Sequence, residues 1–329
     1  MELLRIIAML LVMILHTDLI SFDGLNVIDT VSQPTFSFLR IGVQTTSFIC
    51  VNVFILLSGW YGIRARFSRL GEFYFQVLFF LLLSYAGHLL LNNEVFFSWN
   101  MLLHLFLLNG YWFVTAYLLL YILSPVLNAF IESASKRQLT VVLVLFYIFQ
   151  TVYGWLEDGI LWFDSGSSAI SFIGLYLFGR YMRIYQPNWC KASCRMDIMI
   201  FVVLILLQSV MVFISFRWGI GIITKKVFMN LSPLMIVSSM FLLLAFSKIQ
   251  LQKYWINWIA SSCFAAYLLH AAPYNFEMYL PTLYDWYFSH STISFIVYYV
   301  CYILTIFMFA VFIDKLRMVI WKRILHYYN

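Results

Sequence analysis

The sequence predicts an all-α integral membrane protein that crosses the bilayer with about ten helices. Hydrophobic residues make up 64% of the 329 positions, and charged residues make up only 10%. Soluble domains carry roughly 25% charged residues, so the surface of this chain suits lipid better than water. Long apolar runs recur along the sequence, and most Lys and Arg residues fall into alternate connections between them. Composition, apolar runs and charge distribution therefore indicate the same fold class.

The candidate spans are mostly apolar runs of about 20 residues, the length that a helix needs to cross a bilayer. In chain order they are Leu3–Phe22, Phe38–Ile63, Phe73–Leu91, Tyr111–Ile131, Leu139–Leu156, Ala169–Met182, Ile198–Phe216, Phe228–Phe246, Trp255–Ala272 and Ile293–Ile313. The apolar stretch Phe96–Leu108 is too short to cross, so we expect an interfacial or re-entrant helix there. No connection is long enough for a second domain, and residues 1–329 are predicted to form a single transmembrane domain.

The basic residues predict the orientation of these spans. If the N-terminus lies in the cytoplasm and the spans alternate, fifteen Lys and Arg residues fall on the cytoplasmic side and four on the other. The fifteen are Arg64, Arg66, Arg69, Lys136, Arg137, Arg180, Arg183, Lys191, Arg195, Lys248, Lys253, Lys315, Arg317, Lys322 and Arg323, and the four are Arg40, Arg217, Lys225 and Lys226. Cytoplasmic loops collect Lys and Arg, so we expect an even number of spans with both termini in the cytoplasm.

Charge and cysteine content argue against two other classes of protein. The net charge of +6 at pH 7 is explained by basic cytoplasmic connections, so we expect no nucleic-acid partner. Cys190 and Cys194 have a C-x3-C spacing but no second pair to complete four metal ligands. We therefore expect inert reduced thiols there and no metal site.

The first span carries two ionisable residues, Arg5 and His16, and such residues within a span are functional candidates. Eleven residues bring a helix back to within about 20° of the same face, about 16 Å further along its axis. One face of this helix thus carries a fixed cation near the cytoplasm and a proton acceptor deeper in the membrane. The structural alternatives are a snorkelling Arg5 that sets the orientation, and a His16 that is either hydrogen-bonded in the interior or at the outer headgroup level.

The end of the second span combines a polar residue with a group of arginines. Ser58 lies within the apolar run, and Arg64, Arg66 and Arg69 follow it. The arginines serve either as a positive-inside anchor or as a docking site for an anionic, phosphate-bearing ligand.

Two later segments carry further candidates. Trp112 is the second residue of the fourth span, where an interfacial aromatic belt is the alternative to a functional role. Tyr267 and His270 are three positions apart, so they share a face near the end of the ninth span. A structural hydrogen bond between the two is the alternative there.

These motifs, taken together and in this order, resemble the acyltransferase 3 family of bacterial membrane acyltransferases. Its first span has an Arg-x10-His pattern, which Arg5 and His16 match. The resemblance extends along the chain to Phe54–Trp60 with its Ser-Gly-aromatic ending and the arginines after it, Trp112-Phe113 through Tyr117, Tyr121 and Pro125, Gly179-Arg180 with Arg183, and Tyr267-Leu268-Leu269-His270. The chain departs from the family at Tyr111, where many members have His before the Trp-Phe pair.

The resemblance implies O-acyl transfer from acyl-CoA, which is a substrate rather than a tightly bound cofactor. Acetyl is the implied group, and the implied acceptor is a sugar of a surface polysaccharide or of its lipid-linked precursor. His16 is the implied general base, since an ordinary imidazole pKa of about 6.5 lies near neutrality. Arg5 is placed with it as a catalytic residue that holds donor phosphates.

The remaining candidates take binding and supporting roles in the same hypothesis. Arg64, Arg66 and Arg69 would bind the donor, while Ser58, Trp112, Tyr267 and His270 would support the site. The chain resembles a stand-alone member without a soluble C-terminal domain, in the inner membrane of a bacterial cell. A transporter or flippase of a lipid-linked glycan is the alternative, and it would favour repeated halves, which the sequence does not show.

Overall fold

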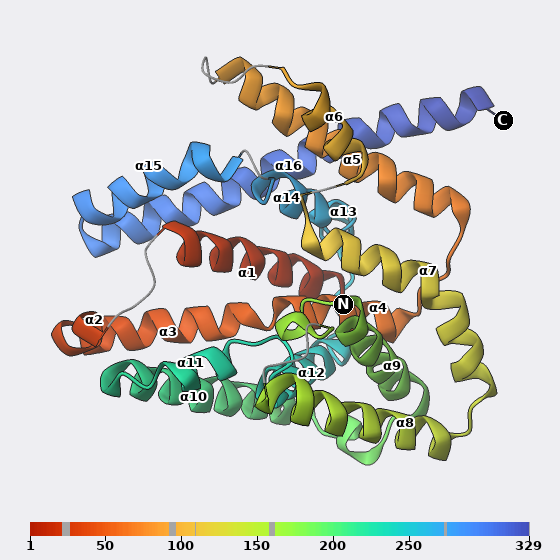
Figure 1. The fold of residues 1–329 in the computed structure, drawn as a ribbon, viewed down its shortest axis with the longest axis vertical. Helices are drawn as coiled ribbons and strands as arrows, with labels where there is room; N and C mark the ends of the chain where they lie inside the picture. Colours follow the sequence, from red (N-terminus) through yellow and green to blue (C-terminus); the bar gives the residue numbers. More distant parts are fainter. Residues whose placement is uncertain (22–26, 92–96, 109, 158–161, 273–274, 329) are drawn as a thin grey trace. The chain divides into compact units, whose positions relative to one another are not determined.

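The computed structural model describes residues 1–21, 27–91, 97–108, 110–157, 162–272 and 275–328. Every regular element within these residues is a helix, which confirms the all-α prediction. The elements (Figure 1) are α1 (Glu2–Ser21), α2 (Val27–Ser32), α3 (Pro34–Phe48), α4 (Cys50–Tyr61), α5 (Phe67–Leu91), α6 (Trp99–Phe106), α7 (Trp112–Ser133), α8 (Lys136–Phe149), η1 (Gln150–Leu156), η2 (Asp164–Gly166), α9 (Ala169–Tyr185), η3 (Asn188–Lys191), α10 (Cys194–Trp218), α11 (Gly221–Val227), α12 (Pro233–Ser247), α13 (Tyr254–Ala260), α14 (Cys263–His270), α15 (Asn275–Ser289) and α16 (Thr292–Tyr328). Phe22 and Phe96, which bound two predicted segments, lie outside the described residues.

Six helices among the described residues are long and apolar enough to cross a bilayer. They are Pro34–Tyr61, Phe67–Leu91, Trp112–Ser133, Lys136–Leu156, Cys194–Trp218 and Thr292–Ile324. These six correspond to the second, third, fourth, fifth, seventh and tenth predicted spans. The membrane character is thereby confirmed, while the count of about ten spans and the cytoplasmic position of both termini stay predictions.

The other four predicted spans are also helical, but they are more polar, shorter or interrupted. α1 has 20 residues and includes charged side chains near both ends. α9 has 17 residues and α12 has 15. The ninth predicted span is divided into α13 and α14. The short segment predicted around Trp99 forms α6, and α15, which contains Pro281, was not predicted at all.

Contacts group the chain into two compact units. The first unit comprises residues 1, 25–65 and 115–251, and the second comprises residues 2–24, 66–114 and 252–329. The single domain expected over residues 1–329 stays a prediction.

In the first unit, α4 and α9 approach each other closely along two glycines. A Cβ atom on Gly59 would lie 2.4 Å from the carbonyl oxygen of Tyr176, and a Cβ on Gly179 would lie 2.6 Å from that of Leu56. Both distances are well inside van der Waals contact, so only glycine allows the two helices to pack this closely.

The residues just before α12 form a buried, non-helical segment of the first unit. The predicted span began at Phe228, but α12 begins at Pro233. The fully buried Asn52 of α4 donates from Nδ2 to the carbonyl of Asn230 at 2.7 Å, and the Asn230 side chain donates to Ser167 Oγ at 3.3 Å. Irregular backbone inside a membrane is tolerated where protein groups satisfy it. Asn52 therefore has a structural role.

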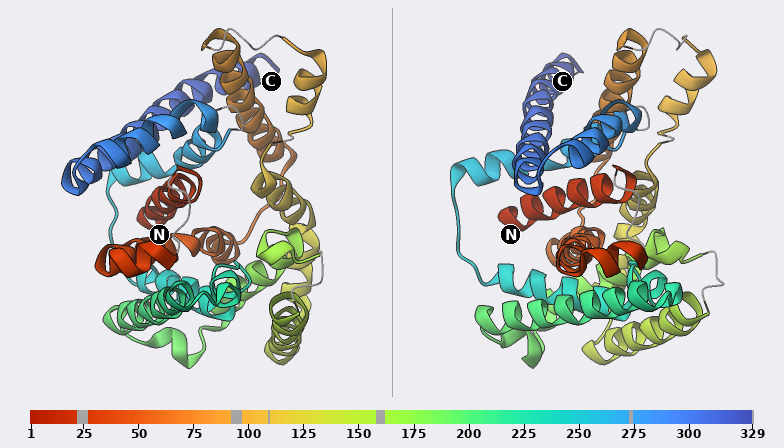
Figure 2. Two further views of the ribbon diagram at one scale, coloured as in Figure 1. Left: turned by 60° about the vertical axis from the view of Figure 1, so that its left-hand side comes forward. Right: turned by 90° about the vertical axis from the view of Figure 1, so that its left-hand side faces the viewer.

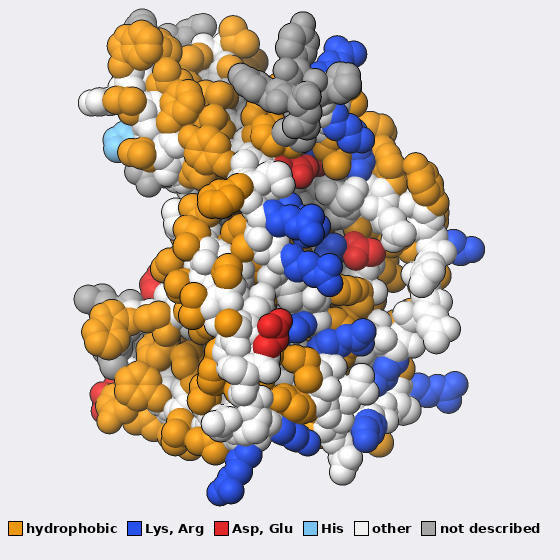
Figure 3. All heavy atoms as spheres, turned by 90° about the vertical axis from the view of Figure 1, so that its right-hand side faces the viewer, with side chains coloured by type: hydrophobic (Ala, Val, Ile, Leu, Met, Phe, Trp, Pro, Cys, Tyr) orange, Lys and Arg blue, Asp and Glu red, His pale blue; other side chains and the backbone are white. Residues whose placement is uncertain are grey.

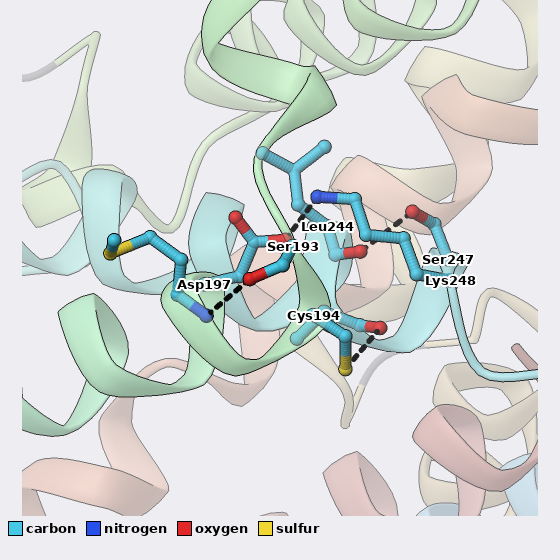
Figure 4. A network of polar contacts seen from close by, with 8 residues as sticks. Ser193, Cys194, Asp197, Leu244, Ser247 and Lys248 are labelled. Atoms are coloured by element: carbon cyan, nitrogen blue, oxygen red, sulfur yellow. Dashed lines mark hydrogen bonds and ion pairs between the residues drawn. The ribbon is translucent and has the colours of Figure 1, made fainter.

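A buried ion pair joins the start of α10 to the end of α12 (Figure 4). The carboxylate of Asp197, which is fully buried, binds the ammonium of Lys248. An acidic group in the first turn of a helix and a basic group at the end of another also suit the two helix dipoles. Beside this pair, the Sγ of Cys194 lies 3.4 Å from the carbonyl oxygen of Ala245.

In the second unit, α1 packs against α13 and α14, and α14 also packs against α5 and α16. α15 lies beside the first part of α16 (Figure 2), and Leu283 and Phe295 form a buried cluster between them. Thr17 of α1 hydrogen-bonds Tyr299 of α16. Thr17 thus ties the C-terminal half of α1 to α16.

The break between α13 and α14 falls at Ser261 and Ser262. The Oγ of Ser261 donates to the carbonyl of Trp258 at 2.9 Å and accepts from Lys315 Nζ at 2.7 Å. Serine side chains that bond to nearby backbone compete with helical hydrogen bonds, which favours an interruption at a Ser-Ser pair. α14 consequently starts anew at Cys263 and ends at His270.

Arg317 takes part in a buried polar contact, while its predicted cytoplasmic position stays a prediction. It lies within α16, beyond the end of the tenth predicted span, and is only 2% exposed. Its Nε donates to Asp314 Oδ1 at 2.7 Å, and Gln76 of α5 donates to the same oxygen at 2.9 Å. Arg317 is therefore part of a buried polar contact between α5 and α16 rather than a surface anchor.

The long helices carry exposed apolar side chains, as a lipid-facing surface requires. Examples are Val141 and Leu145 on α8, and Val203 and Leu206 on α10. The face drawn in Figure 3 shows broad areas of hydrophobic side chains. Hydrocarbon is the medium in which such areas are stable.

Candidate functional site

Two histidines meet inside the second unit. The Nδ1 of His16 on α1 lies 2.9 Å from the Nε2 of His270 on α14, and the ring centroids are 5.1 Å apart. His270 is only 3% exposed, whereas His16 is partly exposed. His270 thus bonds to His16, the other predicted histidine, and not to Tyr267, with which a structural hydrogen bond was the alternative.

The hydrogen bonds of His270 assign the protons of both neutral rings. His270 Nδ1 lies 2.6 Å from the carbonyl oxygen of Ala266, and a carbonyl can only accept, so Nδ1 carries the proton. His270 Nε2 then presents a lone pair and accepts the Nδ1–H of His16. The nitrogen of His16 that can take up a proton is therefore Nε2.

Aromatic rings line the site around the histidines. The ring of Tyr267 lies 6.3 Å from that of His16 and 6.1 Å from that of His270. Tyr111 and Phe113 pack on Tyr267, with ring centroids 5.4 and 5.8 Å from it. Rings at these spacings and angles limit how far the imidazoles can turn.

The carbonyl groups at the end of α14 are held by side chains. Tyr111 donates its hydroxyl to the carbonyl of Leu268, and the Asn275 amide donates to that of Leu269 and to Ser84 Oγ. The last carbonyls of a helix have no partner within it, so these side chains fix the end of α14 and with it His270. The sequence analysis noted Tyr111 only as a departure from the pattern that the chain resembles. No motif in the sequence pointed to Asn275 or Ser84.

Arg5 lies on α1 with His16, as predicted. Its Nη1 is 3.0 Å from the Glu2 carboxylate, and both side chains are about one-third exposed, at 37% and 32%. An exposed ion pair of this kind contributes roughly 0–1 kcal/mol of stability, so it holds Arg5 only weakly.

The other predicted residues occupy separate positions. Ser58, in the first unit, donates to the carbonyl of Phe54 at 3.0 Å and lies 3.4 Å from the Tyr117 hydroxyl. Trp112, in the second unit, is 42% exposed. Its neighbour Phe113 makes the contact with Tyr267 instead.

The three arginines expected to bind the donor are all exposed. Arg64 and Arg66 lie in the non-helical connection between α4 and α5, and Arg69 lies in the first turn of α5. Arg64 belongs to the first unit and the other two to the second. Joint donor binding by the three stays a prediction.

The two cysteines of the C-x3-C segment lie in the first unit. Burial raises the pKa of the Cys190 thiol to about 12, against the opposing charge of Lys248. A thiol with that pKa is mostly protonated and unreactive near neutrality, in keeping with an inert role. Among the described residues, no three His, Cys, Asp or Glu side chains are grouped to hold a metal ion.

The sequence was also compared with known protein families and with known proteins. A family model described as an acyltransferase domain matches residues 1–315. No curated protein and no solved structure matched the chain. The match covers nearly the whole sequence, including both histidines, and it agrees with the motifs read from the sequence. The chain therefore belongs to the acyltransferase 3 family and is a multi-pass membrane acyltransferase.

Proposed function

We propose that the protein transfers an acetyl group from acetyl-CoA to a hydroxyl of a surface polysaccharide or its lipid-linked precursor, in the inner membrane of a bacterial cell. The observation that carries this proposal is the 2.9 Å contact between His16 and His270. It leaves His16 with a basic Nε2 at a partly exposed position, in a chain of an acyltransferase family.

His16 acts as the general base in this mechanism. Its Nε2 takes the proton of the acceptor hydroxyl while the hydroxyl oxygen bonds to the thioester carbonyl carbon. The carbon–sulfur bond then breaks, and the departing sulfur of CoA takes up the proton from His16. A hydroxyl is a weak nucleophile at neutral pH, so such a base contributes typically about 10²–10⁴-fold. Transfer through a transient acyl group on His16 is the alternative route.

His270 stabilises the state of His16 that forms during transfer. When Nε2 of His16 gains a proton, the ring becomes cationic and its Nδ1–H becomes a stronger donor to His270. A hydrogen bond from a charged donor is worth about 1.5–3 kcal/mol, more than one from a neutral ring. Tyr267, with Tyr111 and Phe113 behind it, keeps both rings in place.

The donor is expected to approach from the cytoplasmic side. Acyl-CoA carries several phosphate charges, which Arg5, Arg64, Arg66 and Arg69 suit as cations. The pantetheine arm would follow α1 from Arg5 toward His16, a distance of about 16 Å along an ideal helix. Trp112 and Ser58, which belong to different units, stay proposed as supporting residues.

The test replaces His16 by Ala and measures acyl transfer in membranes with matched protein levels. We expect a loss of at least about 100-fold, because the base is removed. His290→Ala is the matched control, since His290 is exposed and bonds only to the adjacent Ser289 among the described residues. Near-normal transfer by the His16 variant would show that His16 is not the base.

A second measurement identifies the group and the acceptor. Mass spectrometry of surface glycans from cells with and without the protein should show a difference of one acetyl group per modified sugar. Fragmentation then locates the sugar and the hydroxyl. An unchanged glycan mass would contradict the proposed acceptor, and a different mass would replace acetyl by another acyl group.

A further inference from the structure

Two arginines, Arg180 and Arg183, lie near the end of α9 in the first unit, beside the connection that follows α4. Arg180 and Arg183 are three positions apart on α9, so they share a helix face. The contact between Gly59 and Gly179 brings that face against the end of α4. Arg183 lies over the ring of Trp60, with its guanidinium carbon 5.3 Å from the ring centroid.

The guanidinium of Arg180 rests on the backbone at Gly62. A Cβ atom at Gly62 would lie 3.0 Å from Arg180 Nη1 and 3.2 Å from its Cζ. Gly62 also has a φ of +77°, which strongly favours glycine. The turn and the absence of a side chain together leave the space that Arg180 occupies.

Ile63, the next residue, has both its backbone N–H and its carbonyl hydrogen-bonded to side chains. The Ile63 N–H donates to the Tyr176 hydroxyl at 3.1 Å, and the Ile63 carbonyl accepts from Asn128 Nδ2 at 2.8 Å. The Tyr176 hydroxyl in turn donates to Asn128 Oδ1 at 2.6 Å. Side chains from two helices, Asn128 of α7 and Tyr176 of α9, thus hold the backbone at Ile63. Arg64, the next residue, has an exposed side chain.

Arg180 has unused hydrogen-bonding capacity in this fixed setting. Its Nε is buried and has no hydrogen-bond partner, and within the described residues its guanidinium forms no ion pair. A buried donor that lacks a partner is costly, so native structures rarely keep one without a reason. A planar guanidinium fork is well suited to donate to phosphate oxygens, and the exposed Arg64 follows Gly62, which Arg180 contacts, by two positions.

We propose that Arg180, at the Gly62 turn, and Arg64, two positions after that glycine, bind a phosphate group of the acyl-CoA donor. This inference rests on the proposed function for the identity of the ligand. It adds Arg180 to the donor-binding residues and gives Arg64 a partner, whereas Arg183 is held by Trp60 and stabilises the α4–α9 contact. The anion satisfies the guanidinium of Arg180, which the protein itself leaves without a hydrogen-bonded partner.

The experiment uses the full chain in nanodiscs of phosphatidylcholine. Binding of CoA is measured by calorimetry, without turnover, for wild type, Arg180→Gln and the control Arg195→Gln. Arg195 is an exposed arginine of the same unit, so its loss changes the net charge equally. We expect the Kd for CoA to rise by about tenfold to a hundredfold in the Arg180 variant and to stay unchanged in the control. Equal affinities in the two variants would refute the proposal.

Kinetics separate phosphate recognition from a general effect on the fold. The KM for acetyl-CoA should rise in Arg180→Gln, while the KM for acetyl-pantetheine, which has no phosphate, should not change. If Arg180→Gln does not fold, Arg64→Gln provides the test, because an exposed side chain can be removed without disturbing packing. A severalfold rise in the Kd for CoA is expected for it, and an unchanged Kd would count against the site.

Two further results have defined meanings. If native mass spectrometry shows that Arg180→Gln loses a bound phosphatidylglycerol while its Kd for CoA is unchanged, the site holds a lipid headgroup and the donor role is wrong. If wild type binds CoA through Arg180 but transfers no acyl group, the proposed function fails and the phosphate site stands.

Discussion

The Nδ1 of His16 and the Nε2 of His270 lie 2.9 Å apart, although 254 positions separate them in the sequence. Because His270 Nδ1 is committed to the Ala266 carbonyl, the contact fixes which nitrogen of each neutral ring carries a proton. The second histidine therefore decides the tautomer of the first. Substitution of His270 therefore tests how the site works.

His270 is predicted to act as a positioning residue rather than as the base. His270→Leu removes the acceptor for His16 Nδ1–H, so kcat should fall by about tenfold to a hundredfold. His270→Gln places an amide oxygen near the former Nε2 and should recover most of the rate. The KM for acetyl-CoA should stay unchanged in both variants, which initial-rate kinetics on purified protein would show. Equal losses in the two variants would indicate a purely structural role.

The glycine contact between α4 and α9 is predicted to be indispensable for packing. Gly59→Ala and Gly179→Ala place a Cβ atom 2.4 and 2.6 Å from backbone oxygens, so the helices must separate. Overpacking of this kind costs typically about 1–3 kcal/mol, which thermal unfolding in detergent would detect. Gly87→Ala is the control, because a Cβ there meets nothing within 4 Å and alanine favours a helix. Unchanged stability of both packed variants would disprove the close contact.

The ion pair between Asp197 and Lys248 is predicted to stabilise the first unit. Asp197→Leu leaves the Lys248 ammonium without its partner. Breaking a fully buried pair costs roughly 3–5 kcal/mol, and we expect a smaller loss here because the Lys248 side chain is 23% exposed. The double variant Asp197→Leu with Lys248→Met removes both charges and should regain part of that loss. Resistance to unfolding by SDS measures the three proteins on one scale. A double variant no more stable than Asp197→Leu would show that charge pairing is not the source of the stability.

The sequence alone determined the membrane character of this chain and its family. Apolar runs and a low content of charge are averages over many residues, so they do not depend on how the helices pack. The Arg5–His16 spacing is equally local, because a helix sets which residues share a face. The boundaries of α13, α14 and α15 could not be predicted in the same way. Ser261, Ser262 and Pro281 change backbone hydrogen bonding, which the pattern of apolar residues does not reveal.

Only the tertiary structure decided what the polar residues inside these helices do. It brought His270 to His16, and it gave Asn52 and Arg317 structural partners. It also placed Arg180 against the Gly62 turn. Each of these depends on contacts between helices far apart in the chain, and a buried polar group takes its role from the partner that it meets there.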